Sequence, residues 1–432
     1  MRIAATLHAA ATLGALAVAS YLLGLPLLRE RARRGDFLWG HYGWHELWIG
    51  VPALVVALVL TALWLVPRAR RLRAAARALL ATVATLIAVA GFDLVFALVV
   101  RGALHPDYWL DLGHITRADN LPDQELGFVR KPHATWRGLV PGTDRIVEYA
   151  ADENGFRNPP GRVSAEIAFV GDSYTEAAQI ERERIFAELV GQRLGKSIVN
   201  LGRGAYGPQQ EAIVIGRYAL PGKPKLVVWQ LFDGNDLRDA EQFASWSLGE
   251  RAEVPLAERY FANSLFHPLI DATRRERRGE FATLRFDDGH LERLAVRYRW
   301  QPHQSSERPT GLRATERALR EGVAKCAAAD VDVVIVFMPI ATRILRERLD
   351  FLRQEDAASY APPDDGGIDD FAAALHALCK EMEVPLIDLT PVFLRAVQER
   401  ADGIYIPRDE HLDLRGHELV ADTICSWITS RG

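Results

Sequence analysis

The feature that most constrains the fold is a regular alternation of short apolar runs with helical patterns, which begins at Ala165. Five runs rich in β-branched residues predict buried strands at 167–170, 197–201, 226–231, 331–338 and 385–389. The segments between them predict amphipathic helices at 182–194, 209–220, 315–329 and 369–381. Strands that alternate with helices in this way predict an α/β domain with a parallel, doubly wound sheet. In such a sheet, ligands bind beyond the carboxyl ends of the strands.

With 432 residues the chain has room for two or three domains, and the alternation assigns residues 165–432 to one of them. A long insertion, 237–311, separates the third strand from the helix that follows it. Its pattern predicts a helix around 257–274 and a hairpin centred on 287–289. The stretch 101–164 predicts a linker and then a small lead-in of short strands and turns. Insertions at the functional edge of a sheet often shape a binding cleft.

The first hundred residues differ in composition from the rest of the chain. They carry ten arginines against four acidic residues, whereas the remainder carries 42 basic against 52 acidic residues. Long apolar runs predict three transmembrane helices, each close to the ~20 residues that a bilayer core requires, at 3–28, 47–66 and 78–100. The first run has a signal peptide cleaved after 17–19 as its alternative. A basic, apolar front and an acidic remainder predict an integral membrane protein and argue against a nucleic-acid partner.

The distribution of arginine predicts the orientation of this membrane region. The loop between the second and third predicted helices contains five arginines, which favours the cytoplasmic side. The domain after residue 100 then faces the periplasm or the outside of an inner membrane crossed several times. Four arginines at 29–34 oppose this orientation. Asp93 lies within the third predicted helix, where either a functional role or a hydrogen-bonded structural carboxyl would explain it.

Three cysteines, Cys326, Cys379 and Cys425, cannot all pair within the chain, and none has the spacing of a zinc site. Buried free thiols are therefore the expected state. The sequence also contains no phosphate-binding loop and no dinucleotide fingerprint. We expect neither a metal nor an organic cofactor.

Polar residues follow several of the predicted strands. The first strand ends in "GDSYTE" with Ser173, and the second runs into the glycine-rich "NLGRGAYG". The third ends in "GND" with Asn235, and a late "DEH" brings Asp409 and His411. A serine, tight turns, an asparagine and an Asp/His pair at one sheet edge form the set of groups that acyl transfer requires. Helix capping is the competing explanation for the serine, because Ser173 and Glu176 also fit the S-x-x-E capping box.

Together these blocks resemble those of the SGNH (GDSL-type) hydrolase superfamily over roughly 165–427. The resemblance implies a flavodoxin-like, three-layer α/β/α domain. It also implies that Ser173 is the nucleophile, His411 the general base and Asp409 the residue that orients the imidazole. The implied oxyanion hole has three donors: the Ser173 N–H, a backbone N–H of Gly204 or Ala205, and the Asn235 side chain.

Two positions depart from the usual pattern of that superfamily. Ala205 stands where a glycine is usual in the second block, beside Gly204. The last block is Asp-x-His, a spacing that also occurs in alginate-type O-acetylation proteins. The lead-in sequence "ELGF…DENGFR" resembles the segment before this domain in membrane-linked members.

The function predicted from this resemblance is a membrane-anchored serine esterase that acts on O-acyl groups of a carbohydrate, acetyl groups first among them. A second hypothesis is an O-acyltransferase that modifies an extracellular polysaccharide with the help of an acyl-donor partner in the membrane. Both pass through the same acyl-enzyme and differ in the acceptor. A third hypothesis is a catalytically silent polysaccharide-binding or assembly protein, against which the complete Ser/Asn/His set argues.

Overall fold

The computed structural model of the chain divides into two compact units, Met1–Leu104 with Pro255–Arg274 and His105–Val254 with Arg275–Gly432. It describes residues 2–24, 44–101, 120–140, 143–162, 164–249, 260, 264, 281–289, 291–296, 309–351, 371–400, 403–406 and 409–431.

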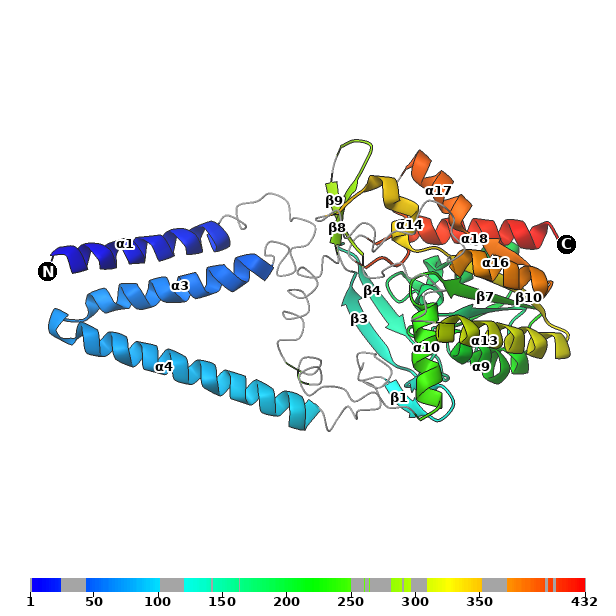
Figure 1. Cartoon of the computed structure of the whole chain (residues 1–432), viewed down its shortest axis with the longest axis horizontal. Helices are drawn as coiled ribbons and strands as arrows, with labels where there is room; N and C mark the ends of the chain where they lie inside the picture. The colour runs from blue at the N-terminus through cyan, green and yellow to red at the C-terminus, as the bar shows by residue number, and fades with distance from the viewer. Residues whose placement is uncertain are drawn as a thin grey trace. The chain divides into compact units, whose positions relative to one another are not determined.

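The amino-terminal unit contains three long helices, α1 (Arg2–Ala19), α3 (Trp44–Leu65) and α4 (Arg68–Val95) (Figure 1). Two π-helical segments, η1 (Ser20–Gly24) and η2 (Phe96–Arg101), continue α1 and α4. In the part of the chain that the structure describes, no helix combines the length and the apolar character needed to cross a membrane. The structure therefore does not support the transmembrane helices predicted at 3–28, 47–66 and 78–100.

The arginine-rich segment before residue 78 is helical and not the loop that the sequence pattern predicted. Helix α4 begins at Arg68, directly after Pro67, and runs through all the arginines of that segment. Arginine and alanine are strong helix formers, so this composition extends a helix as readily as it makes a loop. Charge alone therefore did not mark the start of the helix.

Asp93 lies on α4 and is buried, with 1% of its surface exposed. Its Oδ2 accepts hydrogen bonds from the hydroxyl groups of Tyr260 and Ser264, each at 2.7 Å, and both residues belong to the same compact unit. A buried carboxyl needs such donors. These two bonds satisfy the carboxyl at its buried position on α4.

The second unit is built on a five-stranded parallel sheet, which confirms the predicted α/β class. Its strands are β5 (Ile167–Gly171), β6 (Ile198–Gly202), β7 (Leu226–Phe232), β10 (Asp332–Met338) and β12 (Leu386–Asp388). They lie in the order β6-β5-β7-β10-β12, and every neighbouring pair is parallel. In order of appearance this is 2-1-3-4-5, the flavodoxin-like order, whose switch point lies between β5 and β7.

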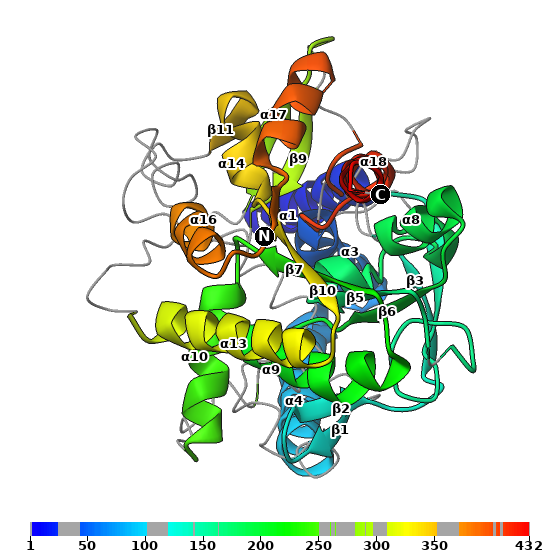
Figure 2. The ribbon, with the colours of Figure 1, turned by 90° about the vertical axis from the view of Figure 1, so that its right-hand side faces the viewer.

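Two apolar cores lie on the two faces of this sheet, because alternate strand residues point to opposite sides. Phe169 and Val228 enter the core formed with α8 (Phe186–Leu194), α17 (Thr390–Glu399) and α18 (Leu414–Thr429). Val170 and Trp229 enter the core formed with α9 (Pro208–Val214), α10 (Asp236–Ser247), α13 (Pro309–Ala328) and α16 (Phe371–Glu381). Figure 2 shows α9 and α13 on one side of β5–β7 and α8 and α18 on the other.

Several helices differ in detail from the sequence prediction. The predicted helix at 182–194 is split into η3 (Arg182–Arg184) and α8, because Ile185 is extended and fully buried between them. The predicted helix at 209–220 consists of α9, the π-helical η4 (Ile215–Ala219) and the short η5 (Leu220–Gly222). Three further short helices are α7 (Ser173–Glu176), α14 (Ala341–Leu345) and η6 (Arg346–Arg348).

The lead-in consists of two antiparallel hairpins, as the sequence predicted. One pairs β1 (Asn120–Asp123) with β2 (Gly127–Arg130), and the other pairs β3 (Thr135–Leu139) with β4 (Ile146–Ala150). In the insertion, the hairpin predicted around 287–289 is confirmed as β8 (Phe281–Arg285) and β9 (Leu291–Ala295), joined at β8 by β11 (Leu349–Phe351). Nearly all of the helix predicted around 257–274 lies outside the described residues.

The three cysteines are free thiols. Cys326 and Cys379 are buried, as expected, and Cys425 is half-buried. Burial raises the pKa of the Cys326 thiol to about 11 and that of Cys379 to about 12. Both therefore stay protonated at neutral pH and serve as apolar core residues.

Candidate active site

Ser173 is the first residue of α7 and directly follows the turn at the carboxyl end of β5. The residue that caps this helix is Asp172, whose Oδ1 accepts the Tyr174 N–H at 2.9 Å. The competing explanation, a capping box through Ser173, is therefore wrong, because Asp172 caps the helix and the partner of the Ser173 hydroxyl is His411. Gly171 permits the sharp turn, since a Cβ there would lie 2.5 Å from the Thr175 hydroxyl and 2.6 Å from Gln230 Oε1.

The structure brings Ser173, His411 and Asp409 together. His411 Nε2 lies 2.8 Å from Ser173 Oγ, and His411 Nδ1 makes a short hydrogen bond with Asp409 Oδ1. An Nδ1–H that donates to a carboxylate leaves the Nε2 lone pair facing the serine hydroxyl. The side chains of His411 and Asp409 are 11% and 8% exposed, so both groups are largely shielded from water. This is the geometry that activates a serine nucleophile.

A tight loop presents the histidine and the aspartate on the same side. The Ile406 N–H donates to the His411 carbonyl at 2.8 Å, and the Asp409 N–H donates back to the Ile406 carbonyl at 3.1 Å. Glu410 takes a φ of +66° between the two functional residues. This left-handed residue reverses the chain, which lets side chains two positions apart meet.

Tyr174 contacts the loop that carries His411, and Gln179 lies beside the imidazole at Nδ1, the ring nitrogen that faces away from Ser173. The Tyr174 hydroxyl donates to the Glu410 carbonyl at 2.9 Å, and its ring centroid lies 5.0 Å from that of His411. Gln179 Nε2 lies 3.2 Å from His411 Nδ1. Tyr174 thus ties α7 to the loop that carries His411.

The predicted oxyanion donors are not equivalent in the structure. The Gly204 N–H already donates to Glu176 Oε2 at 2.7 Å, so it would have to break that bond to reach an oxyanion. Within the described residues, the N–H groups of Ser173 and Ala205 make no hydrogen bond. Asn235 Nδ2 donates one hydrogen to Asp239 Oδ2 at 2.5 Å and retains a second.

Four buried carboxyl groups lie close enough to one another to interact, and no sequence motif predicted their grouping. They belong to Asp172, Glu211, Asp236 and Asp239. Burial raises the pKa of Asp172 to about 6 and holds the pKa values of Glu211 and Asp236 well above their usual range. Repulsion between neighbouring carboxyls adds to this effect. In the described part of the chain, no group of three His, Cys, Asp or Glu side chains could hold a metal ion.

The raised pKa of Glu211 predicts a pH-dependent cost of folding. Glu211 Oε2 accepts the Trp229 indole N–H at 2.8 Å, a bond that a glutamine oxygen can replace. At a pH between the unfolded and the folded pKa, the wild type must take up a proton on this group to fold. That uptake costs about 1.4 kcal/mol for each pH unit by which the pH exceeds the unfolded pKa. Below the unfolded pKa that cost vanishes. Glu211→Gln should therefore raise the melting temperature clearly at pH 8 and little at pH 4, as thermal denaturation at both pH values would measure. An equal shift at both would contradict the prediction.

No family model matches this chain, and no curated protein matches it. Solved structures match part of this chain at low similarity. A putative lipolytic protein of the G-D-S-L family from Desulfitobacterium hafniense is 13% identical, with 60% of this chain and 97% of that chain covered and a TM-score of 0.34. An acetyl xylan esterase is 15% identical, with 61% and 98% covered and a TM-score of 0.34. A catalytic mutant of an acetylxylan esterase from Geobacillus stearothermophilus is 12% identical, with 61% and 94% covered and a TM-score of 0.35. These identities and scores are too low to carry an activity over to this chain.

Proposed function

We propose that this chain is a serine esterase that works through an acyl-enzyme intermediate. The observation that carries the proposal is the hydrogen-bonded series from Ser173 Oγ through His411 to Asp409, with 2.8 Å between Oγ and Nε2. A serine hydroxyl is a weak nucleophile until a neighbouring base can take its proton. A buried carboxylate on the far nitrogen keeps the imidazole in the tautomer that can do so.

The reaction follows from these positions. His411 Nε2 takes the proton as Ser173 Oγ attacks the ester carbonyl carbon, which gives a tetrahedral oxyanion. The oxyanion collapses, the C–O bond to the alcohol breaks, and His411 returns the proton to the leaving alkoxide. Water, activated by the same imidazole, then attacks the acyl-serine and releases the acid. Asp409 stabilises the imidazolium in both halves.

Charge that develops on the carbonyl oxygen requires donors that are not already occupied. The Ser173 N–H, the Ala205 N–H and the second hydrogen of Asn235 Nδ2 meet this condition. Ala205 takes a φ of +69°, in the region where glycine is usual. We assign these three groups to the oxyanion hole.

The substrate that we propose is an O-acyl ester of a carbohydrate, with acetyl as the acyl group. Support for the substrate comes from the sequence blocks "GDSYTE", "GND" and "DEH", which resemble SGNH-type enzymes. Transfer to a sugar hydroxyl would use the same acyl-serine, with the hydroxyl in place of water as acceptor.

The deciding experiment is turnover of p-nitrophenyl acetate by the purified full chain, with and without an oligosaccharide acceptor. We expect p-nitrophenol release and labelling by a fluorophosphonate. Free acetate as the main product in both conditions supports the esterase, whereas acetylated oligosaccharide identifies a transferase. Absence of both turnover and labelling would refute an acyl-enzyme mechanism.

From the sequence alone we also propose that residues 1–100 anchor the chain in an inner membrane, with the α/β domain on the periplasmic side. Long apolar runs and five arginines in one connecting segment support this orientation. We expect the full chain to sediment with bacterial membranes after carbonate extraction, and a periplasmic reporter fused after Gly432 to be active. Recovery in the soluble fraction would refute the anchor. An active cytoplasmic reporter would reverse the orientation and exclude an extracellular substrate.

A further inference from the structure

The Glu176 carboxylate is buried three residues after the proposed nucleophile and is bonded through both of its oxygens. Only 2% of the residue is exposed. Oε1 makes a short ion pair with Arg130 Nη2 and accepts the Tyr149 hydroxyl at 2.8 Å. Oε2 accepts the Gly204 N–H at 2.7 Å and lies 3.4 Å from Arg203 Nη1. One carboxylate thus joins the nucleophile helix, the lead-in and the loop after β6.

The lead-in contributes more than one partner to this network. Arg130 on β2 lies against the rings of Trp136 and Tyr149, with its guanidinium carbon 4.5 and 4.8 Å from the ring centroids. Arg157, also from the lead-in, donates to the carbonyls of Ala177 and Ile180 just beyond α7. The lead-in therefore contacts the helix that carries Ser173 in two places, at the Glu176 side chain through the hairpin residues Arg130 and Tyr149 and at its carboxyl end through Arg157.

The loop at 202–205 packs directly on this helix. A Cβ at Gly204 would lie 2.9 Å from Glu176 Oε2 and 3.5 Å from Ser173 Cβ, and a Cβ at Gly202 would overlap the Glu176 backbone nitrogen. The bond from the Gly204 N–H to Glu176 fixes the orientation of that peptide group. The orientation of this peptide group sets the direction in which the chain enters the next residue, Ala205, whose φ is +69°, in the left-handed region.

We propose that Glu176 is a positioning residue that sets the 202–205 loop beside Ser173, and that Arg130 and Tyr149 of the lead-in complete this support. The inference rests on the proposed function, because it concerns the donors that face the oxyanion. A loop shifted by the loss of the carboxylate would leave substrate binding intact and would weaken stabilisation of the tetrahedral state. Loss of the carboxylate should therefore lower kcat and leave KM nearly unchanged.

The test compares Glu176→Gln with Tyr149→Phe in the full chain. Removal of an oxyanion donor costs roughly 10²- to 10³-fold in kcat, so a displaced donor should cost about 10- to 100-fold. We expect this loss for Glu176→Gln, and a loss of about 3- to 10-fold for Tyr149→Phe, which removes one hydrogen bond and keeps all the charges. KM for p-nitrophenyl acetate should stay within about twofold in both variants. The rate of inactivation by a fluorophosphonate should fall in parallel, because its phosphoryl oxygen occupies the same donors.

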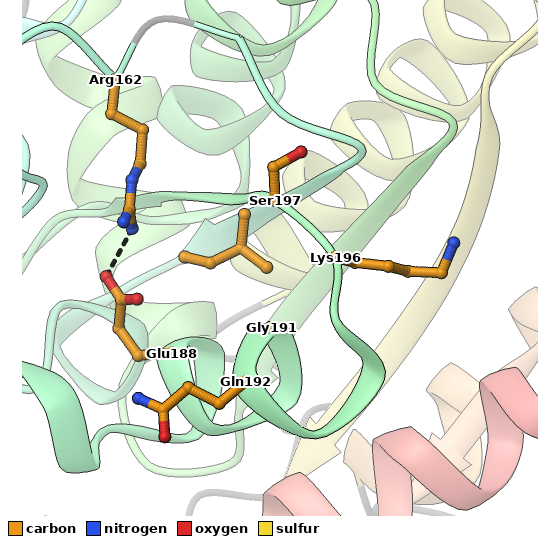
Figure 3. A pocket seen from close by; sticks show the side chains of 7 residues that line it. Arg162, Glu188, Gly191, Gln192, Lys196 and Ser197 are labelled. Atoms are coloured by element: carbon orange, nitrogen blue, oxygen red, sulfur yellow. Dashed lines mark hydrogen bonds and ion pairs between the residues drawn. The ribbon is translucent and has the colours of Figure 1, made fainter.

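The matched control is Glu188→Gln. Glu188 also pairs with an arginine, Arg162 at 2.6 Å, but in a pocket that includes Ser197 and Ile198 at the amino end of β6 (Figure 3). This is the sheet edge opposite to Ser173, since β5 and β6 are parallel. We expect its kcat to equal that of the wild type.

The outcomes separate positioning from stability alone. Folded Glu176→Gln with a lower melting temperature and an unchanged kcat would overturn the inference, as would equal losses in the Glu188→Gln control. If Glu176→Gln does not fold, Tyr149→Phe decides: a lower kcat at constant KM supports the inference and an unchanged kcat overturns it. A wild type that neither turns over ester nor reacts with the phosphonate refutes the proposed function itself, and this inference with it.

Discussion

Ser173→Ala should abolish turnover of p-nitrophenyl acetate, with a loss on the order of 10⁴-fold or more in kcat. The loss is large because the members of a triad act as a unit, so the base has no function once the hydroxyl is gone. The hydroxyl lies 2.8 Å from His411 Nε2, and the helix is capped by Asp172. The fold should therefore survive the substitution. The measurements are kcat, fluorophosphonate labelling and the melting temperature.

The control for this substitution is Ser197→Ala. The Ser197 hydroxyl also makes one hydrogen bond, from the Glu166 N–H at 3.0 Å, at the amino end of β6. Its loss should leave turnover and labelling unchanged. Normal labelling of Ser173→Ala would show that another residue is the nucleophile, and the proposed mechanism would then be wrong.

The sheet was predictable from the sequence because its strands are buried on both faces. Such strands appear as near-continuous apolar runs, and each of their limits in the structure lies within one residue of the predicted one. Helix α10 was not predicted. It begins at Asp236, within the motif that carries Asn235, and its first turn is rich in acidic residues rather than apolar ones. The residues read as a functional motif are thus also the first residues of a helix, and the sequence analysis missed that helix.

The site was predictable only as far as its residues form short motifs. Ser173, Asp409 and His411 stand in such motifs, and the structure brings them together. The residues that bind the Glu176 carboxylate form no such motif, because Arg130 and Tyr149 lie 46 and 27 residues away from it along the chain. An arginine on a lead-in strand has no local signal that identifies its partner. Contacts of this kind follow from packing and not from sequence pattern.

The capping of α7 shows that a sequence can match a capping motif without using it. Ser173 and Glu176 satisfy the S-x-x-E pattern, but the side chain that caps the helix belongs to Asp172. Glu176 instead faces two arginines and the Gly204 N–H. The pairing of a buried carboxylate with two guanidinium groups outweighs one capping bond, because an unpaired buried charge is far more costly than an uncapped N–H.

Asp409→Asn should lower kcat by roughly two to four orders of magnitude while KM changes little. The carboxylate accepts the His411 Nδ1–H, and an asparagine that turns its NH₂ group toward this nitrogen would favour the opposite tautomer, with Nε2 protonated. An imidazole in that state cannot take the serine proton. The variant should keep the wild-type melting temperature within a few degrees, because Asp409 belongs to a loop whose backbone bonds to Ile406 remain.

Asp413→Asn is the matched comparison, since Asp413 is also two residues from His411 but on its other side. Its side chain caps α18 through the Leu414 N–H at 2.8 Å and pairs with Arg145 at 2.5 Å, with about a fifth of each side chain exposed. Asparagine retains the cap and loses the ion pair, so the expected cost is ~1 kcal/mol of stability and no large change in kcat. Steady-state kinetics and thermal denaturation of both variants test the pair. If Asp413→Asn is the inactive enzyme and Asp409→Asn turns over normally, then the carboxylate that orients His411 in solution is not the one that contacts it in this structure.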